Sequence, residues 1–399
     1  MNDMSGKPSS LSVFAIYAIA LLAEGAGTVV IPLWVLSLNP TPTMFGIVIG
    51  AKGLLPLLFS IHGGVLMDRF GAARILQVAS LTGFFLPILF PLLPNLWAAL
   101  VLQMISGFVI TISWIGAQTL ISQSLNGERA YFSRLSFFNR TGVFICPLVA
   151  GYAWDFWGAT GGFVTMFLMS TTALVSSFLL PKAKVQIVGP TFSIREFVPR
   201  WSDYRDALWL LSIPAVLLTS LASVVNVAVG TVQQSFYIVY LEKLGMTGTM
   251  IAILVAAPNL LGVLGTMGIG RAVRKIGDMH MLIYVVMLSS LVVLVTPLFV
   301  QFIALLLIGS LRGWGMGAAQ PLMMSIPAKA VRQGAYGSAA GLRISLNRLV
   351  QTLLPPMMGL MVEFAGLKNS FFITGTLMLC VTGIILKMTR QQGISSRSE

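Results

Sequence analysis

Long apolar stretches follow one another along the whole chain, separated by short segments that carry Pro, Gly, Asn or charged side chains. A helical stretch of about 20 apolar residues is long enough to cross the roughly 30 Å hydrocarbon core of a bilayer. The pattern therefore predicts an all-α membrane protein with twelve transmembrane helices. We expect them at residues 11–38, 44–67, 73–93, 96–124, 131–154, 160–180, 206–241, 247–270, 279–300, 302–328, 335–362 and 369–387.

One polar and basic segment interrupts this pattern near the middle of the chain. Because the other loops are short, this segment is the natural boundary between two domains. We predict an N-terminal six-helix bundle at residues 1–180, a cytoplasmic linker at 181–205 and a C-terminal six-helix bundle at 206–399.

The two halves repeat each other at a nearly constant spacing. Residues of the fifth and sixth predicted helices recur 208 residues later, and residues around the second helix recur 206 residues later. The pairs include Asn139 with Asn347, Arg140 with Arg348, Pro147 with Pro355, Gly151 with Gly359, Asp155 with Glu363, Gly158 with Gly366, Gly64 with Gly270 and Gly71 with Gly277. Such a parallel repeat predicts two pseudo-symmetric bundles with a binding site near the membrane midplane between them.

The loop after the second predicted helix carries a compact motif, Gly64-Val-Leu-Met-Asp68-Arg69-Phe-Gly71-Ala-Ala-Arg74. The glycines permit a tight turn and a close approach of helices. Asp68 can meet a helix N-terminus, and the two arginines can bridge to the other half. The motif resembles the G-x-L-x-D-R-x-G-x-x-R/K signature of the major facilitator superfamily. That resemblance implies the twelve-helix fold and a cytoplasmic gate held by these residues; the alternative is a loop that serves topology alone, through its positive charge.

A second resemblance is to the drug and metabolite exporter branch of the same superfamily, and it is partial. Pro147 is similar to the proline at the centre of that branch's motif in helix 5, but Cys146 stands where the branch has glycine. In helix 4 the branch places an arginine four residues before a glycine, whereas Gln103 precedes Gly107 here. This departure puts the transfer of that branch's proton-coupling scheme in doubt.

Composition and charge agree with a membrane protein. Apolar residues make up 56% of the chain and charged residues 9%, against about 25% charged residues in soluble domains. About 18 of the 25 Lys and Arg residues lie in one alternating set of loops and the tails, two lie in the other set and five lie inside the spans. The positive-inside rule then predicts cytoplasmic termini in a bacterial inner membrane, and the net charge of +13 needs no nucleic-acid partner. Two cysteines inside spans predict neither a disulfide nor a zinc site, and we expect no cofactor, no metal and no enzyme chemistry.

Six Asp, Glu, Lys or Arg residues lie inside the predicted spans away from their ends, and each costs about 2.5–3.5 kcal/mol at a helix centre unless it faces protein or water. They are Glu24, Lys52, Arg140, Arg312, Arg343 and Arg348. Arg343 lies near enough to the cytoplasm to reach it by its long side chain. For Arg140 and Arg348, which are equivalent in the repeat, together with Asn139 and Asn347, we expect a shared substrate site to which Arg312 and Lys52 also contribute. Backbone carbonyls at broken helices are the structural alternative.

The excess of buried basic residues predicts an anionic substrate, since a guanidinium binds carboxylate through two parallel hydrogen bonds. Glu24, the one acidic residue in a span away from its ends, is the candidate for proton coupling; a permanent ion pair with Lys52 is the alternative. We predict a monomeric secondary transporter that exports a carboxylate such as a siderophore by proton antiport. The alternatives are a proton-coupled importer of an organic anion and a non-transporting membrane receptor. Gln233, Gln234, Tyr237 and Tyr240, late in the seventh helix, either line a polar cavity or face lipid headgroups.

Overall fold

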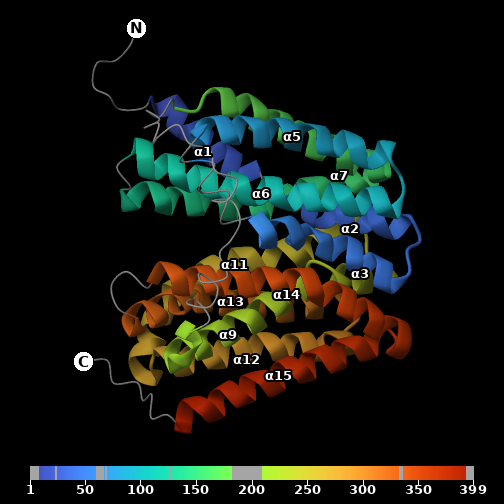
Figure 1. The fold of residues 1–399 in the computed structure, drawn as a ribbon. Helices are drawn as coiled ribbons and strands as arrows, with labels where there is room; N and C mark the ends of the chain where they lie inside the picture. Colours follow the sequence, from blue (N-terminus) through green and yellow to red (C-terminus); the bar gives the residue numbers. More distant parts are fainter. Residues whose placement is uncertain are drawn as a thin grey trace. The chain divides into compact units, whose positions relative to one another are not determined.

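The structure is a computed structural model that describes residues 9–22, 25–59, 67, 70–125, 128–181, 209–331 and 336–391. Its described residues form α-helices, short 3₁₀ turns and loops, and no strand occurs among them. The helices of the first sequence half are α1 (Ser10–Leu22), α2 (Gly27–Ser37), α3 (Pro42–Gly50), the 3₁₀ turn η1 (Ala51–Gly53), α5 (Ala72–Leu92), α6 (Leu96–Ser124) and α7 (Arg129–Phe178) (Figure 1).

The helices of the second half are η3 (Leu210–Ser212), α9 (Pro214–Gln233), α10 (Phe236–Lys243), α11 (Gly248–Ile276), α12 (Asp278–Val295), η4 (Thr296–Leu298), α13 (Phe302–Ala330), α14 (Tyr336–Ala365) and α15 (Leu367–Gln391). These bounds agree closely with the predicted spans, and the predicted all-α class is confirmed. Among the described residues, nine helical segments are long and apolar enough to cross a membrane.

Short turns and kinks interrupt the helical conformation in and between several of the predicted spans. The span at 206–241 is broken between α9 and α10, where Ser235 leaves the helical conformation with φ −127° and ψ −98°. Its hydroxyl donates to the carbonyl of Thr231 at 2.6 Å, which satisfies a backbone acceptor that the broken helix exposes. The spans at 131–154 and 160–180 both lie in the element α7, as two helices that meet at a kink where Gly158 has the non-helical φ 59° and ψ −145°; the two predicted helices are therefore present.

The repeat that the sequence predicts is visible in the backbone. Six of the described residues have positive φ, and they form three pairs: Asn39 with Gly245, Gly71 with Gly277, and Gly158 with Gly366. The spacings are 206, 206 and 208 residues, the same as in the sequence repeat. Because the left-handed conformation costs little only for glycine and, to a lesser degree, asparagine, the same three turns require the same special residues in both halves.

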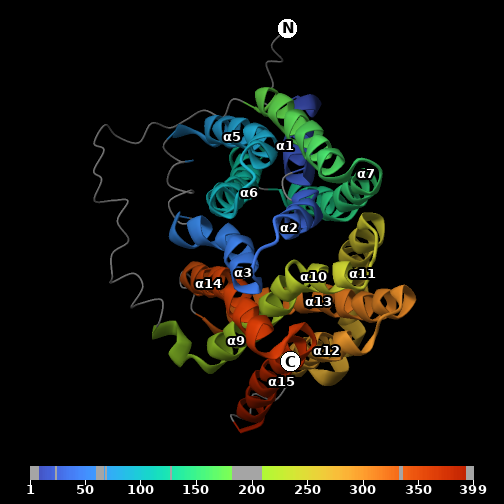
Figure 2. The ribbon, with the colours of Figure 1, turned by 90° about the vertical axis from the view of Figure 1, so that its right-hand side faces the viewer.

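Backbone contacts divide the chain into two units. The first contains residues 1–40, 51–193 and 246–252, and the second contains 41–50, 194–245 and 253–399. One short segment of each sequence half thus belongs to the unit that the other half mainly forms: 41–50 belongs to the second unit and 246–252 to the first. In the first unit α5 lies against α6 and α7, and in the second unit α12 lies against α13 and α15 (Figures 1 and 2).

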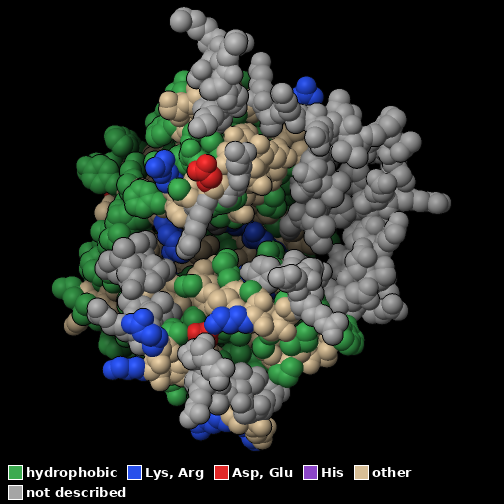
Figure 3. Space-filling model, turned by 90° about the vertical axis from the view of Figure 1, so that its left-hand side faces the viewer, with side chains coloured by type: hydrophobic (Ala, Val, Ile, Leu, Met, Phe, Trp, Pro, Cys, Tyr) green, Lys and Arg blue, Asp and Glu red, His purple; other side chains and the backbone are tan. Residues whose placement is uncertain are grey.

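The interior of the first unit is apolar where α1, α5, α6 and α7 meet. Ile16, Leu76, Leu120 and Leu135 are fully buried there. Large apolar side chains such as Trp97 and Val78 are exposed on the outside of the same helices, as expected for a surface that faces lipid tails. On the face shown in Figure 3, Lys and Arg side chains are frequent and acidic side chains are few.

Candidate functional site

A cavity of about 110 Å³ lies inside the first unit, between α1, α2, α5, α6 and α7. Most of its wall is apolar, and the polar exceptions come from four separate elements. They are Lys52, Ser80, Gln103, Ser106, Ser113 and Ser170. The volume is several times the roughly 10–15 Å³ that one water needs, so the cavity has room for a small molecule.

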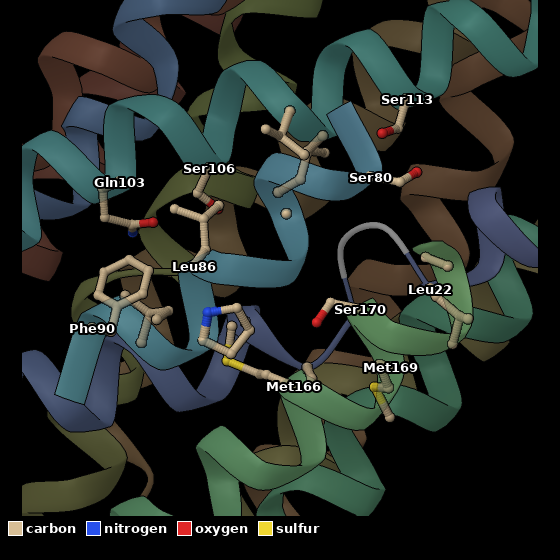
Figure 4. A pocket seen from close by; sticks show the side chains of 18 of the residues that line it. Leu22, Ser80, Leu86, Phe90, Gln103, Ser106, Ser113, Met166, Met169 and Ser170 are labelled. Carbon is tan, nitrogen blue, oxygen red and sulfur yellow. The ribbon is translucent and has the colours of Figure 1, made fainter. Parts of the chain in front are cut away.

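The polar groups occupy defined places along this cavity. Ser80 of α5 and Ser113 of α6 lie together at one end, and Gln103 lies near Phe90 at the other (Figure 4). Ser80 is 6% exposed, and its buried hydroxyl has no hydrogen-bond partner among the described residues. A buried polar group without a partner costs about 1–3 kcal/mol, so this hydroxyl favours a bound molecule that supplies one.

Lys52 reaches this cavity because of a tight approach between two elements. The chain leaves α3 at Gly50 and passes through η1, whose backbone lies directly on α6 at Gly107. A Cβ atom added to Gly107 would lie 2.7 Å from the carbonyl carbon of Lys52, well inside the 3.5–4.0 Å of an ordinary carbon–carbon contact. Only glycine at this position lets the Lys52 backbone come so close.

The second unit has a cavity at the equivalent place in the repeat. Its volume is about 20 Å³, and it lies between α9, α10, α12, α13 and α15. Eight positions that line the first cavity match, 206 residues later, eight that line the second. The pairs are Ala26 with Val232, Gly27 with Gln233, Ile31 with Tyr237, Leu86 with Val292, Pro87 with Val293, Phe90 with Thr296, Gln103 with Gly309, and Ser106 with Arg312.

Three of these exchanges place larger polar side chains at the second, smaller cavity. Gln233, Tyr237 and Arg312 replace Gly27, Ile31 and Ser106, so larger polar side chains occupy space that is open in the first unit. The sequence left two alternatives for the polar residues late in the seventh predicted helix, which either line a polar cavity or face lipid headgroups. Gln233 and Tyr237 line the cavity. The hydroxyl of Tyr240 instead donates to the Phe299 carbonyl at 2.8 Å, and Gln234 is exposed.

Arg312 is the most deeply buried basic residue that the structure describes. Its side chain is 6% exposed, and neither Nε nor Nη1 has a hydrogen-bond partner among the described residues. The side-chain oxygen of Gln233, which lines the same cavity, is also without one. At about 20 Å³ the cavity beside Arg312 holds one water-sized species and has no room for an organic substrate in this structure.

Comparison with known proteins identifies the family. The family model for the Major Facilitator Superfamily matches residues 13–299 and 219–396. The chain is a member of this superfamily. The resemblance seen in the sequence motif is thereby confirmed, and the chain is a multi-pass membrane protein of a transporter superfamily.

Solved transporter structures share the superfamily fold with this chain. The nucleoside transporter NupG matches with a TM-score of 0.74 at 12% identity, over 95% of this chain and 99% of NupG. A POT family transporter in complex with 5-aminolevulinic acid matches with a TM-score of 0.75 at 15% identity, over 98% of both chains. A bacterial homologue of the human lysosomal transporter Spinster matches with a TM-score of 0.76 at 12% identity over both full lengths. No curated protein sequence matches the chain significantly.

The paired asparagines of this superfamily member hold its helices together. The amide of Asn139 in α7 donates to the Ala20 carbonyl of α1 at 3.0 Å. The amide of Asn347 in α14 donates to the Ser223 hydroxyl of α9, also at 3.0 Å. Each bond joins two helices of the same unit, and the pair α1 and α7 is equivalent in the repeat to the pair α9 and α14. Both asparagines therefore hold helices in position. Their predicted contact with substrate stays a prediction.

The paired arginines lie one residue further along the same helices. Nη1 of Arg348 donates to the side-chain oxygen of Gln351 at 2.9 Å, and the side chain is half-buried. Arg140 is half-buried on α7. The two arginines belong to different units, so the shared site that we expect for them stays a prediction.

The predicted gate and proton residues are described only in part. Gly71 has φ 87° and precedes α5, which confirms the tight turn expected there; Gly277 repeats it with φ 88° before α12. Arg74 is exposed in the first turn of α5. Gly64, Asp68 and Arg69, the linker, and Glu24 lie outside the described residues, and their roles stay predictions.

Two carboxylates cap the segments that the sequence halves exchange. Asp155 accepts hydrogen bonds from the backbone N–H groups of Gly248, at 2.5 Å, and Thr249, at 2.9 Å, in the first turn of α11. Glu363, the repeat equivalent of Asp155, accepts from the N–H of Thr43 in the first turn of α3 at 3.1 Å. That hydrogen bond lowers the pKa of the exposed Glu363 carboxyl, so the group stays ionised at neutral pH.

Proposed function

We propose that this chain is a secondary transporter that exports a small organic anion across a bacterial inner membrane by alternating access, coupled to proton entry. Membership of the superfamily supports transport itself. The anionic substrate, the direction and the proton coupling are our inference from the charges of the interior.

The charge distribution of the described residues supports an anionic substrate. Basic side chains occur along the membrane helices, whereas every described carboxylate lies at or near a helix end. The basic residues inside the predicted spans and away from their ends are Lys52, Arg140, Arg312, Arg343 and Arg348. The described acidic residues are Glu128, Asp155, Glu242, Asp278 and Glu363. A cation would meet repulsion in such an interior, and an anion would be attracted.

The cavity of the first unit supports a small substrate with several acceptor groups. Lys52 supplies positive charge, and the hydroxyls of Ser80 and Ser113 supply hydrogen-bond donors. A carboxylate that carries further oxygen atoms would satisfy both kinds of group at once. Walls formed by Leu86, Phe90 and other apolar side chains would then exclude water from the bound molecule.

Proton coupling is proposed for Glu24. It is the one acidic residue in the predicted spans away from their ends, and in the sequence it stands between the last residue of α1 and the first residue of α2. A carboxyl in this setting gains protons when it is desolvated and loses them when a cation approaches, so a change of cavity access can change its protonation. Glu24→Gln should therefore abolish transport driven by a pH gradient and preserve exchange of substrate for substrate.

The test is transport by purified protein in proteoliposomes under an imposed pH gradient. Small carboxylates, neutral polar molecules and organic cations are compared on wild type, Arg140→Gln and Arg348→Gln. Lys243→Gln, which removes an exposed basic residue at the end of α10, is the matched control. We expect transport of carboxylates alone, at least tenfold slower in both arginine variants and unchanged in the control.

Each part of the proposal has its own contradicting result. Equal transport of cations and anions, with normal rates in both arginine variants, would exclude an anion site. Carboxylate uptake driven by an inward proton gradient would favour the importer instead. Unchanged gradient-driven transport in Glu24→Gln would assign coupling to another group or another ion.

A further inference from the structure

We propose that the interior cavity of the second unit binds a single halide-sized anion, held by Arg312, Gln233 and Tyr237. This site differs from the substrate cavity of the first unit. It stands or falls independently of which organic molecule the protein carries, and of the direction in which it is carried.

The buried charge of Arg312 requires a counter-charge. A guanidinium stays protonated in proteins, so burial cannot neutralise it by loss of a proton. Burial of an unpaired ion costs several kcal/mol even after relaxation. The residues that line this cavity include no carboxylate, and Nε and Nη1 of Arg312 lack acceptors among the described residues. A bound anion supplies the charge and the acceptor together, whereas a water molecule supplies only the acceptor.

The size and the donors of the cavity select a small ion. About 20 Å³ exceeds the 10–15 Å³ that one water needs, and it is too little for a carboxylate metabolite. The Gln233 amide and the Tyr237 hydroxyl can turn donors towards an anion beside Arg312. The remaining wall is mainly apolar, with Val292, Ile308 and Phe371. A weakly hydrated ion that accepts from every side, chloride under cellular conditions, fits this arrangement.

The repeat shows that this polar set is particular to the second unit. The equivalent residues in the first unit are Ser106, Gly27 and Ile31, which together carry no charge. Conversely, Gly309 stands where the first unit has Gln103. The absence of a side chain at Gly309 keeps open the space next to the Gln233 amide that an ion would occupy.

Two substitutions test separately the charge of Arg312 and the room for an ion in the cavity. Arg312→Met removes the guanidinium and keeps a long side chain. Gly309→Ala keeps the guanidinium and adds one methyl group, 3.7 Å from Pro258 Cγ and 3.9 Å from Gln233 Nε2. These are ordinary contact distances, so the helix should tolerate the methyl while it takes up the room for the ion. Gly383→Ala in α15, where an added Cβ meets nothing within 4 Å, is the matched control.

The experiment is thermal unfolding of detergent-purified full-length protein, titrated with sodium chloride against sodium gluconate at constant ionic strength. A ligand that binds only the folded state raises the unfolding temperature with its concentration. We expect a saturable rise with chloride and with bromide in wild type and in Gly383→Ala. In Gly309→Ala and Arg312→Met the dissociation constant for chloride should be at least tenfold weaker. Crystals grown in bromide should show an anomalous peak beside Arg312.

Three results would overturn the site: equal unfolding temperatures of wild type in chloride and gluconate, an undiminished chloride response in Gly309→Ala, or a bromide peak elsewhere in the protein alone. Should Arg312→Met fail to fold, Gly309→Ala still decides the question, because it leaves the charge in place.

Discussion

Replacing Gly107 with alanine is expected to destabilise the protein and to disturb the substrate cavity together. The new Cβ would lie 2.7 Å from the carbonyl carbon and 3.0 Å from the Cα of Lys52. The carbonyl oxygen of Lys52 would lie nearer still to the new Cβ, so relief to an ordinary contact of 3.5–4.0 Å requires that η1 and α6 separate by at least about 1 Å. Because η1 carries Lys52 into the cavity, that movement displaces the one basic residue that lines it.

The magnitude follows from known costs of overpacking. Extra atoms in a well-packed interior cost about 1–3 kcal/mol. Replacing glycine with alanine within a helix stabilises the folded protein by about 0.5–1 kcal/mol at most, which offsets part of that cost. The difference is a net loss of roughly 0–2.5 kcal/mol for Gly107→Ala, with a central value of about 1 kcal/mol. Gly313→Ala should behave alike, since its Cβ would lie 2.5 Å from the carbonyl carbon of Pro258, the repeat equivalent of Lys52.

The assay compares thermal unfolding and substrate transport of Gly107→Ala with those of Gly230→Ala. An added Cβ at Gly230, in α9, meets nothing within 4 Å, so this variant controls for the change in helix propensity. We expect Gly107→Ala to unfold at a lower temperature and to transport more slowly, with Gly230→Ala close to wild type. Equal stability and equal transport of the two variants would refute the close approach of η1 to α6.

Three further predictions concern the caps, the gate and the topology. Asp155→Ala should cost about 0.5–2 kcal/mol in unfolding measurements, as for other helix N-caps, and Asp155→Asn should cost less because it keeps an acceptor; equal losses would argue against the cap. Asp68→Asn should slow transport strongly at normal expression, since a gate residue acts on the balance between two states, and wild-type rates would exclude a gate. A cysteine at Ser193 should be protected from impermeant reagents added to intact cells; labelling from outside would reverse the predicted orientation.

The sequence was sufficient for the helices, the repeat and the family. Apolar stretches of about 20 residues locate membrane helices because the bilayer core has a set thickness. The predicted span at 96–124 coincides with α6. The turn glycines were also readable, since a positive φ nearly demands glycine, and Gly71 and Gly158 recur at their repeat positions. The break before α10 was missed, although the polar run Gln233-Gln234-Ser235 inside an apolar span was a signal for it.

The tertiary structure alone decided which side chains meet. The sequence placed Arg312 inside a predicted membrane span, but its closeness to Gln233 and Tyr237 arises only when α9, α10 and α13 pack together. The sequence also could not show that Asn139 donates to the Ala20 carbonyl, more than a hundred residues away. The pattern of apolar and polar residues along the chain indicates which residues can be buried, because burial depends on each residue's own chemistry. The contacts that a side chain makes with another helix depend on which helix faces pack together. Those faces are formed by residues far apart in the chain, so a local sequence pattern does not show them.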